Sequence, residues 1–172
     1  MSIGAHKFYG PKGVGALFAR NGTPIVPTQT GGSQERGLRA GTLNVPLIVG
    51  MAEALRLTAE SRAADNPRYQ HLRDRLVSGI LAGVPRARLT GHPTERLPNH
   101  ASFAFQGVDG NALMAALDLA GYACSSGSAC KTGQPEPSDV LTALGLSRDW
   151  ALGSLRVTVG RGTTEGEIEG FL

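Results

Sequence analysis

Two residues in this sequence have neighbours that suit covalent chemistry, Lys7 and Cys130. Lys7 stands in the run AHK, at the end of an expected strand and just before the glycine-punctuated turn GPKG. A lysine amine forms a Schiff base with a carbonyl group when burial or a cationic neighbour keeps the amine uncharged. A lysine in a strand can equally lie at the surface with only its aliphatic stem covered, so both interpretations stay open.

Cys130 ends the small-residue stretch SSGSAC, which we expect to form an exposed loop. A thiol on such a loop can reach a substrate, although a loop cysteine with no chemical role is also compatible with the pattern. Cys124 ends the expected short strand YAC and is interpreted as a packed core residue. The C-x5-C spacing differs from the C-x2-C of zinc sites, and no histidine spacing suggests a metal site.

A third stretch, TGGSQERGLRAGT, combines glycines with Arg36, Arg39 and Thr42. Glycines free backbone amides for anion contacts, and guanidinium groups pair with carboxylates and phosphates. The stretch therefore predicts either an anion site or an ordinary surface loop. The run GPKGVG is not a phosphate-binding P-loop, because the order G-x4-G-K-[ST] is missing.

The elements that position these residues begin with two expected strands, 3–9 and 14–19, joined by the GPKG turn. Residues 21–44 are expected to form a loop. Asn44 is a suitable N-cap for a helix with Pro46 in its first turn. The spacing of three and four predicts one buried helix face, made of Ile48, Met51, Ala52, Leu55 and Ala59.

Pro67 interrupts the helical pattern, so we expect one helix to end there and a second to follow. The second helix carries Leu72, Leu76 and Ile80 on one face and ends at Gly83. This break is our predicted domain boundary, which divides the chain into residues 1–66 and 67–172.

The rest of the chain alternates between short strands and helices, which indicates an α/β fold. Strands are expected in ARLTG, ASFAFQ, YAC and LRVTVG. Ala101, Phe103 and Phe105 should share one face of their strand. Helix starts are expected after the caps Asp109, Ser138 and Thr164, and Gly121 should follow the helix that Asp109 begins. Glu167 stands at the capping-box distance from Thr164.

Composition excludes several classes of protein. The chain has 172 residues, 41% of them hydrophobic, and a formal charge of +3, so it can bury a core. The arginines are scattered without basic runs, which does not favour nucleic-acid binding. No apolar run approaches the roughly 20 residues that span a bilayer, and the first residues lack the pattern of a signal peptide. We therefore expect a soluble, cytoplasmic protein with no nucleic-acid or membrane partner.

Six motifs occur here in one order: AHKFYGPKGVGAL, GGSQERGLRAGTLN, RLPN, SSGSAC, EPSDVLTALGL and SLRVTVGR. Together they resemble the NifS/IscS-type cysteine desulfurases, which are pyridoxal-phosphate enzymes of the class V aminotransferase group. The resemblance extends over essentially all of the chain. It implies a partial fold-type-I transferase, with the end of the large cofactor-binding domain over 1–66 and the small C-terminal α/β domain over 67–172.

The resemblance also implies roles for five residues. Lys7 resembles the lysine that forms the Schiff base with pyridoxal 5'-phosphate, and His6 resembles the neighbour that helps to hold the cofactor phosphate. Thr42 resembles the threonine that reaches the phosphate of the partner subunit. Cys130 resembles the cysteine that accepts sulfur as a persulfide, and Arg156 resembles the arginine that binds the substrate carboxylate.

In that family, sulfur is removed from L-cysteine, which leaves alanine and a persulfide for iron–sulfur cluster or thio-cofactor synthesis. The resemblance therefore implies pyridoxal 5'-phosphate as cofactor and L-cysteine as substrate. It further implies a homodimer or higher oligomer, and an iron–sulfur scaffold or another sulfur-acceptor protein as partner.

Two departures from the family pattern shape the expectation. The family has a long N-terminal part before the lysine, with an aspartate for the pyridine nitrogen, a stacking histidine and a phosphate loop. We expect this chain to be the C-terminal portion without that half, and its exposed apolar surface to favour oligomers or aggregation. Gly4 also stands where the family has a serine whose hydroxyl binds the phosphate.

Three hypotheses follow. The chain is a cysteine desulfurase by descent that is weak or inactive alone, and becomes active if another chain supplies the missing half. Alternatively it is a catalytically silent fragment that acts as a folding or partner-binding module. A third possibility is another class V enzyme, such as a selenocysteine lyase or an aminotransferase, although an aminotransferase has no use for the thiol in SSGSAC.

Overall fold

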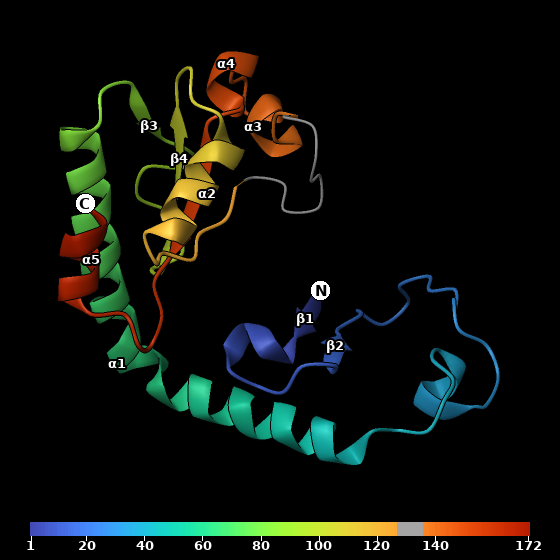
Figure 1. The fold of residues 1–172 in the computed structure, drawn as a ribbon. Coiled ribbons are helices and arrows are strands. Elements are labelled where there is room, and N and C mark those ends of the chain that lie inside the picture. The colour runs from blue at the N-terminus through green and yellow to red at the C-terminus, as the bar shows by residue number, and fades with distance from the viewer. Residues whose placement is uncertain (127–135) are drawn as a thin grey trace. The chain divides into compact units, whose positions relative to one another are not determined.

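One long helix, α1 (Val45–Gly83), belongs to both of the units into which the chain divides (Figure 1). The computed structural model describes residues 1–126 and 136–172. Packing separates these residues into the units Met1–Arg62 and Ala63–Leu172. The mixture of helices and strands confirms the expected α/β class, while the domain boundary at 66/67 stays a prediction.

The first unit begins with an antiparallel hairpin in which β1 (Ser2–Gly4) pairs with β2 (Gly15–Leu17). The expected strands 3–9 and 14–19 are therefore wrong in extent, because Ala5–Phe8 form a 3-10 turn, η1. Ala5 donates its N–H to the carbonyl of Val14 and accepts from the N–H of Gly10, which turns the chain out of the strand. A Cβ on Gly10 would lie 2.9 Å from the Cβ of Ala5, so glycine permits this close return.

The expected loop 21–44 is irregular apart from a second 3-10 turn, η2 (Gln34–Gly37). Glu35 and Arg36 have positive φ angles of 51° and 58° inside that turn. Residues other than glycine adopt this left-handed conformation infrequently, and it is found most often where other contacts fix the backbone. The N–H of Ala40 donates to the carbonyl of Gln29, so the ends of the segment that contains this turn lie next to each other.

The start of α1 confirms the predicted cap, because the N–H of Leu47 donates to Asn44 Oδ1 over 3.3 Å. The predicted buried face is wrong: Leu55 is 48% exposed, whereas its neighbour Ala54 is buried. The helix packs against the hairpin turn through smaller residues. A Cβ on Gly50 would lie 3.2 Å from Pro11, and the hydroxyl of Thr58 donates to the carbonyl of Phe8.

Pro67 lies inside α1 and does not end it, so the prediction of two separate helices is wrong. Proline removes the hydrogen bond to the carbonyl four residues earlier, that of Ala63. Both residues are exposed, so water can bind the freed carbonyl. Packing of Tyr69 and Leu72 against the core directly after the proline favours continued helix. The helix ends at Gly83, as predicted.

The second unit is built on a three-stranded antiparallel sheet of order β3-β4-β5. The strands are β3 (Ala87–Leu89), β4 (His100–Phe105) and β5 (Ser154–Thr158). In β4, Ala101, Phe103 and Phe105 are buried, which confirms the predicted face.

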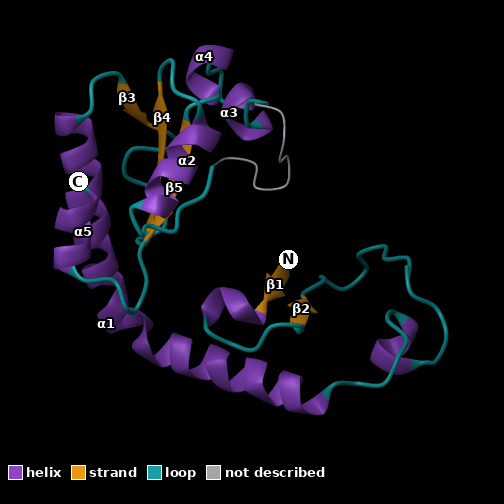
Figure 2. Cartoon of the chain, viewed as in Figure 1, coloured by secondary structure: helices purple, strands orange, loops and turns teal. Residues whose placement is uncertain are grey.

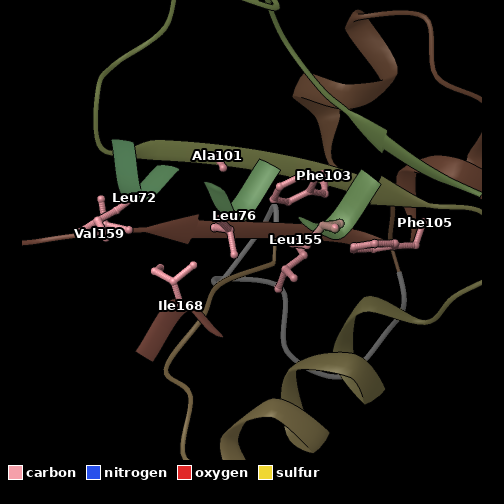
Figure 3. Packing of buried hydrophobic residues seen from close by; sticks show 9 residues of the cluster. Leu72, Leu76, Ala101, Phe103, Phe105, Leu155, Val159 and Ile168 are labelled. Atoms are coloured by element: carbon pink, nitrogen blue, oxygen red, sulfur yellow. The ribbon is translucent and has the colours of Figure 1, made fainter. Parts of the chain in front are cut away.

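The core of this unit joins the sheet to the second half of α1 and to α5 (Glu165–Phe171), as Figure 3 shows. Phe103 and Leu76 are its largest fully buried side chains. The cluster consists of Leu72, Leu76, Ile80, Ala101, Phe103, Phe105, Leu155, Val159 and Ile168.

The described part of the unit also contains three further helices: α2 (Gly110–Leu119), α3 (Asp139–Ala143) and α4 (Arg148–Ala151) (Figure 2). Asp109 accepts hydrogen bonds from two N–H groups at the start of α2, which confirms it as the cap. Gly121 follows the helix with a φ of 90°. Thr164 forms the predicted capping box with Glu167 at the start of α5.

Residues 122–124 do not form the predicted strand YAC. The next residue, Ser125, forms an isolated bridge to Arg156. Within the described residues, no helix is both long enough and apolar enough to cross a membrane.

Candidate active site

His6 and Lys7 lie side by side in η1, not at a strand end, and both side chains are exposed. Ala5, directly before them, is fully buried, and Tyr9, directly after, adopts a left-handed conformation with φ of 67°. The backbone of Ala5 holds the turn, because its N–H donates to the carbonyl of Val14 and its carbonyl accepts from the N–H of Gly10. The turn exposes an imidazole and, on the next residue, a primary amine, which are the groups expected for a phosphate contact and a Schiff base.

Gly4 lies directly beneath the imidazole of His6. A Cβ built on Gly4 would lie 3.2 Å from His6 Cε1 and 3.4 Å from Nδ1. The backbone of Gly4 is extended, with φ of −114° and ψ of 129°, a conformation open to every residue type. The position therefore has no conformational need for glycine, and only the imidazole restricts its space.

The loop that leads to Thr42 is held by its own polar groups. The N–H of Ala40 donates to the carbonyl of Gln29, and the N–H of Gly41 donates to Gln34 Oε1 over 3.1 Å. Arg39 donates to the carbonyl of Ala40, so one of its donors serves the loop itself. Thr42 is exposed, and among the described residues no hydrogen bond joins it to His6 or Lys7. A threonine that serves a partner subunit would need no such contact within its own chain.

Arg156 lies in the middle of β5, in the second unit, directly opposite Ser102 of β4. Its side chain is exposed, and Nη2 donates to Ser125 Oγ over 3.1 Å. Its backbone N–H donates to the carbonyl of Ser125 over 2.6 Å, and the N–H of Ser125 donates back over 3.2 Å. The guanidinium thus projects from a strand whose backbone is fixed on both sides.

His100 shares this part of the sheet, two positions before Ser102 in β4. Partial burial lowers the pKa of His100, and the positive charges of Arg156 and Arg96 lower it further. A lowered pKa means that the imidazole of His100 takes up a proton less readily than an ordinary histidine. Arg156 and Arg96 thus disfavour a further positive charge on His100.

Of the two cysteines, Cys124 lies within the described residues. Cys124 is half-buried against the hydrophobic core, which agrees with its interpretation as a packing residue, and burial raises the pKa of its thiol. A raised pKa leaves less of the nucleophilic thiolate. Cys130, the predicted persulfide cysteine, lies outside the described residues.

The structure therefore places His6 and Lys7 together in the first unit and Arg156 in the second. Sequence reasoning missed Ser125, which contacts Arg156 through both its backbone and its hydroxyl. The only sequence signal for Ser125 is that it begins a serine-rich run directly after the expected strand YAC. Spacing along the sequence does not show which strand this stretch pairs with. Among the described residues, no group of three metal-binding side chains is present.

Comparison with known proteins agrees with the resemblance in the motifs. Residues 1–171 match the family Aminotransferase class-V. A cysteine desulfurase of Cereibacter sphaeroides is 46% identical over 172 residues, and the cysteine desulfurase NifS of Azotobacter vinelandii is 44% identical over 169 residues. These matches cover 100% and 98% of this chain but only 44% and 42% of the relatives.

Solved structures of similar fold agree with this family match. A NifS-like protein from Rickettsia africae superposes with a TM-score of 0.86 at 29% identity, covering 99% of this chain and 44% of that one. A structure of SspA in complex with cysteine superposes with a TM-score of 0.60, also at 29% identity, over 92% of this chain and 43% of that one. The chain thus spans less than half the length of these relatives. Because the family match covers nearly all of it, the chain belongs to the class V aminotransferase family.

Proposed function

We propose that this chain contributes the lysine, the sulfur-accepting cysteine and the carboxylate-binding arginine of a cysteine desulfurase that depends on pyridoxal 5'-phosphate. The observation that carries the proposal is the 46% identity to the Cereibacter cysteine desulfurase along the whole chain. The sulfur atom of L-cysteine is transferred to Cys130 as a persulfide, and the remaining carbon skeleton leaves as alanine.

The residues of the first unit fit the aldehyde and the phosphate of this cofactor. Lys7 offers a primary amine on an anchored turn, and His6 offers an imidazole beside it. The exposed hydroxyl of Thr42 suits a phosphate oxygen, and its assignment to a partner subunit makes a homodimer or higher oligomer part of the proposal. When bound, the cofactor supplies the electron sink for charge at the substrate α-carbon. Lys7 Nζ moves the α-proton.

Arg156 is suited to the substrate carboxylate. Its guanidinium is exposed, and among residues 1–126 and 136–172 no carboxylate lies within ion-pair distance of it. A planar guanidinium binds a carboxylate through two parallel hydrogen bonds. The relative SspA, solved in complex with cysteine, supports a cysteine ligand for this group of proteins. An iron–sulfur scaffold or another sulfur-acceptor protein would then take the persulfide sulfur.

A second candidate is a catalytically silent module that binds partners. The favouring observation is that the side chains of His6 and Lys7 are exposed and, among the described residues, form no hydrogen bond or ion pair. A Schiff-base lysine is normally held in a desolvated pocket. The chain alone is therefore expected to have weak activity or none.

A chimera tests the proposal in a complete protein. The part of the Cereibacter desulfurase that precedes the match is joined to Met1, and alanine release from L-cysteine is measured together with the mass of Cys130. We expect alanine and a gain of one sulfur atom on Cys130. Both should be lost in Lys7→Ala and Cys130→Ala, and retained in the matched controls Lys12→Ala and Cys124→Ala. Full activity in Lys7→Ala would show that the assignment is wrong.

The 172-residue chain alone separates the two candidates. It is mixed with pyridoxal 5'-phosphate, treated with borohydride and digested for mass spectrometry. A functional lysine turn is supported if the cofactor is attached mainly to Lys7. The total amount of attached cofactor should then fall in Lys7→Ala but not in Lys12→Ala. Equal labelling of Lys7 and Lys12 would favour the silent module.

A further inference from the structure

Ser125 and Arg156 are joined by three hydrogen bonds at one point of the sheet. Two are backbone bonds, from Arg156 N to Ser125 O over 2.6 Å and from Ser125 N to Arg156 O over 3.2 Å. The third joins the side chains, from Arg156 Nη2 to Ser125 Oγ over 3.1 Å. Ser125 is the one described residue in its segment that pairs with β5, as an isolated bridge.

The hydroxyl of Ser125 is itself held in place. It donates to the carbonyl of Ser126 over 3.0 Å, so its proton points away from the guanidinium and an oxygen lone pair remains for Arg156. The backbone bridge fixes the Cα positions of both residues, and the hydroxyl then fixes one end of the guanidinium. A long, exposed side chain thereby loses part of its rotational freedom before any ligand binds.

The charge of Arg156 is not neutralised by this contact. Ser125 is a neutral acceptor, and Ser102, directly opposite in β4, accepts a hydrogen bond from Thr90 Oγ1 over 2.8 Å. Among the described residues, no acidic side chain forms an ion pair with Arg156. The guanidinium is therefore oriented by a hydroxyl while its charge and its other N–H donors remain available to an anion.

We propose that Ser125 is a positioning residue that holds the guanidinium of Arg156 ready for a substrate carboxylate. The inference rests on the proposed function, in which Arg156 binds that carboxylate. Ser125 stands five residues before Cys130 in the sequence. The residue that positions the arginine would therefore lie shortly before the proposed sulfur acceptor in the chain. The bound carboxylate itself contacts Arg156, not Ser125.

Loss of the hydroxyl should weaken carboxylate binding modestly. Ser125→Ala removes a hydrogen bond to a charged group, but water can replace part of that interaction because Arg156 is exposed. We therefore expect the affinity for the carboxylate to fall about three- to tenfold. Ser125→Thr keeps a hydroxyl and should retain the wild-type affinity. Thr158→Ala is the matched control, because Thr158 is also exposed and lies two residues beyond Arg156 in β5.

The experiment uses the 172-residue chain and two NMR readouts. Relaxation of Arg156 Nε–Hε measures the order of the side chain without any ligand, and titration with acetate measures carboxylate affinity. We expect Ser125→Ala to lower the order of Nε–Hε and to weaken acetate binding three- to tenfold, with Ser125→Thr and Thr158→Ala close to wild type. When Arg156 is replaced by lysine, the additional substitution Ser125→Ala should no longer weaken acetate binding.

The two readouts separate the inference from the proposed function. An unchanged Nε–Hε order in Ser125→Ala overturns the positioning role, whatever acetate does. Lower order in Ser125→Ala, with no acetate shift at Arg156 in the wild type, supports the positioning role and contradicts the carboxylate-binding role of the arginine. A loss of order that also appears in Thr158→Ala would mark a general loosening of β5 and would overturn the inference.

Discussion

Truncation of Phe103 to alanine should remove a large part of the stability of the unit Ala63–Leu172. Phe103 is fully buried in the centre of β4, with its ring stacked 6.2 Å from that of Phe105. A buried phenylalanine replaced by alanine costs about 3–5 kcal/mol. A domain of this size has about 5–15 kcal/mol in total. With a urea m-value of about 1–3 kcal/mol/M, the midpoint should fall by roughly 2 M.

Trp150 allows this change to be measured in the right unit, since it is the single tryptophan of the chain and lies in α4. Its fluorescence in a urea titration reports the unit that contains Phe103. The matched control is Leu119→Ala, because Leu119 lies in the same unit and is 90% exposed. It should shift the free energy of unfolding by less than about 0.5 kcal/mol. A Phe103→Ala midpoint no lower than that of Leu119→Ala would refute the assigned core.

Three further predictions concern a cap, a titration and the lysine turn. Thr164→Ala removes the capping box of α5 and should lower the free energy of unfolding by about 1 kcal/mol in the same urea titration. The pKa of His100 lies below its ordinary value, so the unfolded chain binds the proton first as pH falls, and stability should decline below about pH 6.5. His100→Gln should flatten that decline, and an unchanged pH profile would contradict the pKa shift. Gly4→Ser should fold normally and strengthen the binding of pyridoxal 5'-phosphate by about tenfold or more in the chimera.

Features that depend on neighbouring residues were predictable from the sequence. The caps Asn44, Asp109 and Thr164 were identified because a short polar side chain reaches N–H groups only two or three residues away. The face of Phe103 in β4 followed from the alternation of a half-buried strand. These signals need no knowledge of distant parts of the chain.

Features set by distant contacts were not predictable in the same way. The large aliphatic residues of α1 suggested a buried face around Leu55, yet the helix contacts the hairpin turn through Gly50 and Ala54, where small size permits close approach. Pro67 carries a strong signal for a helix end, which packing of the following turn overrides. The contact between Ser125 and Arg156 was missed for the same reason, because the two residues are 31 positions apart in the sequence.

Gly4 shows how the structure can decide between two explanations of a departure from the family pattern. If packing required glycine, a serine hydroxyl would be excluded by the fold. The backbone at Gly4 suits any residue, and a Cβ would approach only the Cε1 and Nδ1 atoms of the exposed His6 ring, at 3.2 and 3.4 Å. An exposed ring can move by a few tenths of an ångström at little cost.

A hydrogen bond to a charged phosphate contributes about 1.5–3 kcal/mol, which exceeds that small cost. The backbone and surroundings of Gly4 impose no packing requirement for glycine, so we propose that Gly4 lacks a phosphate donor and that Gly4→Ser should bind the cofactor more tightly. The measurement is a titration of the chimera with pyridoxal 5'-phosphate, followed through the fraction fixed on Lys7 by borohydride. Gly4→Ala is the control, because it adds the Cβ without the hydroxyl. Equal affinities for the serine and alanine variants would show that the hydroxyl does not reach the phosphate.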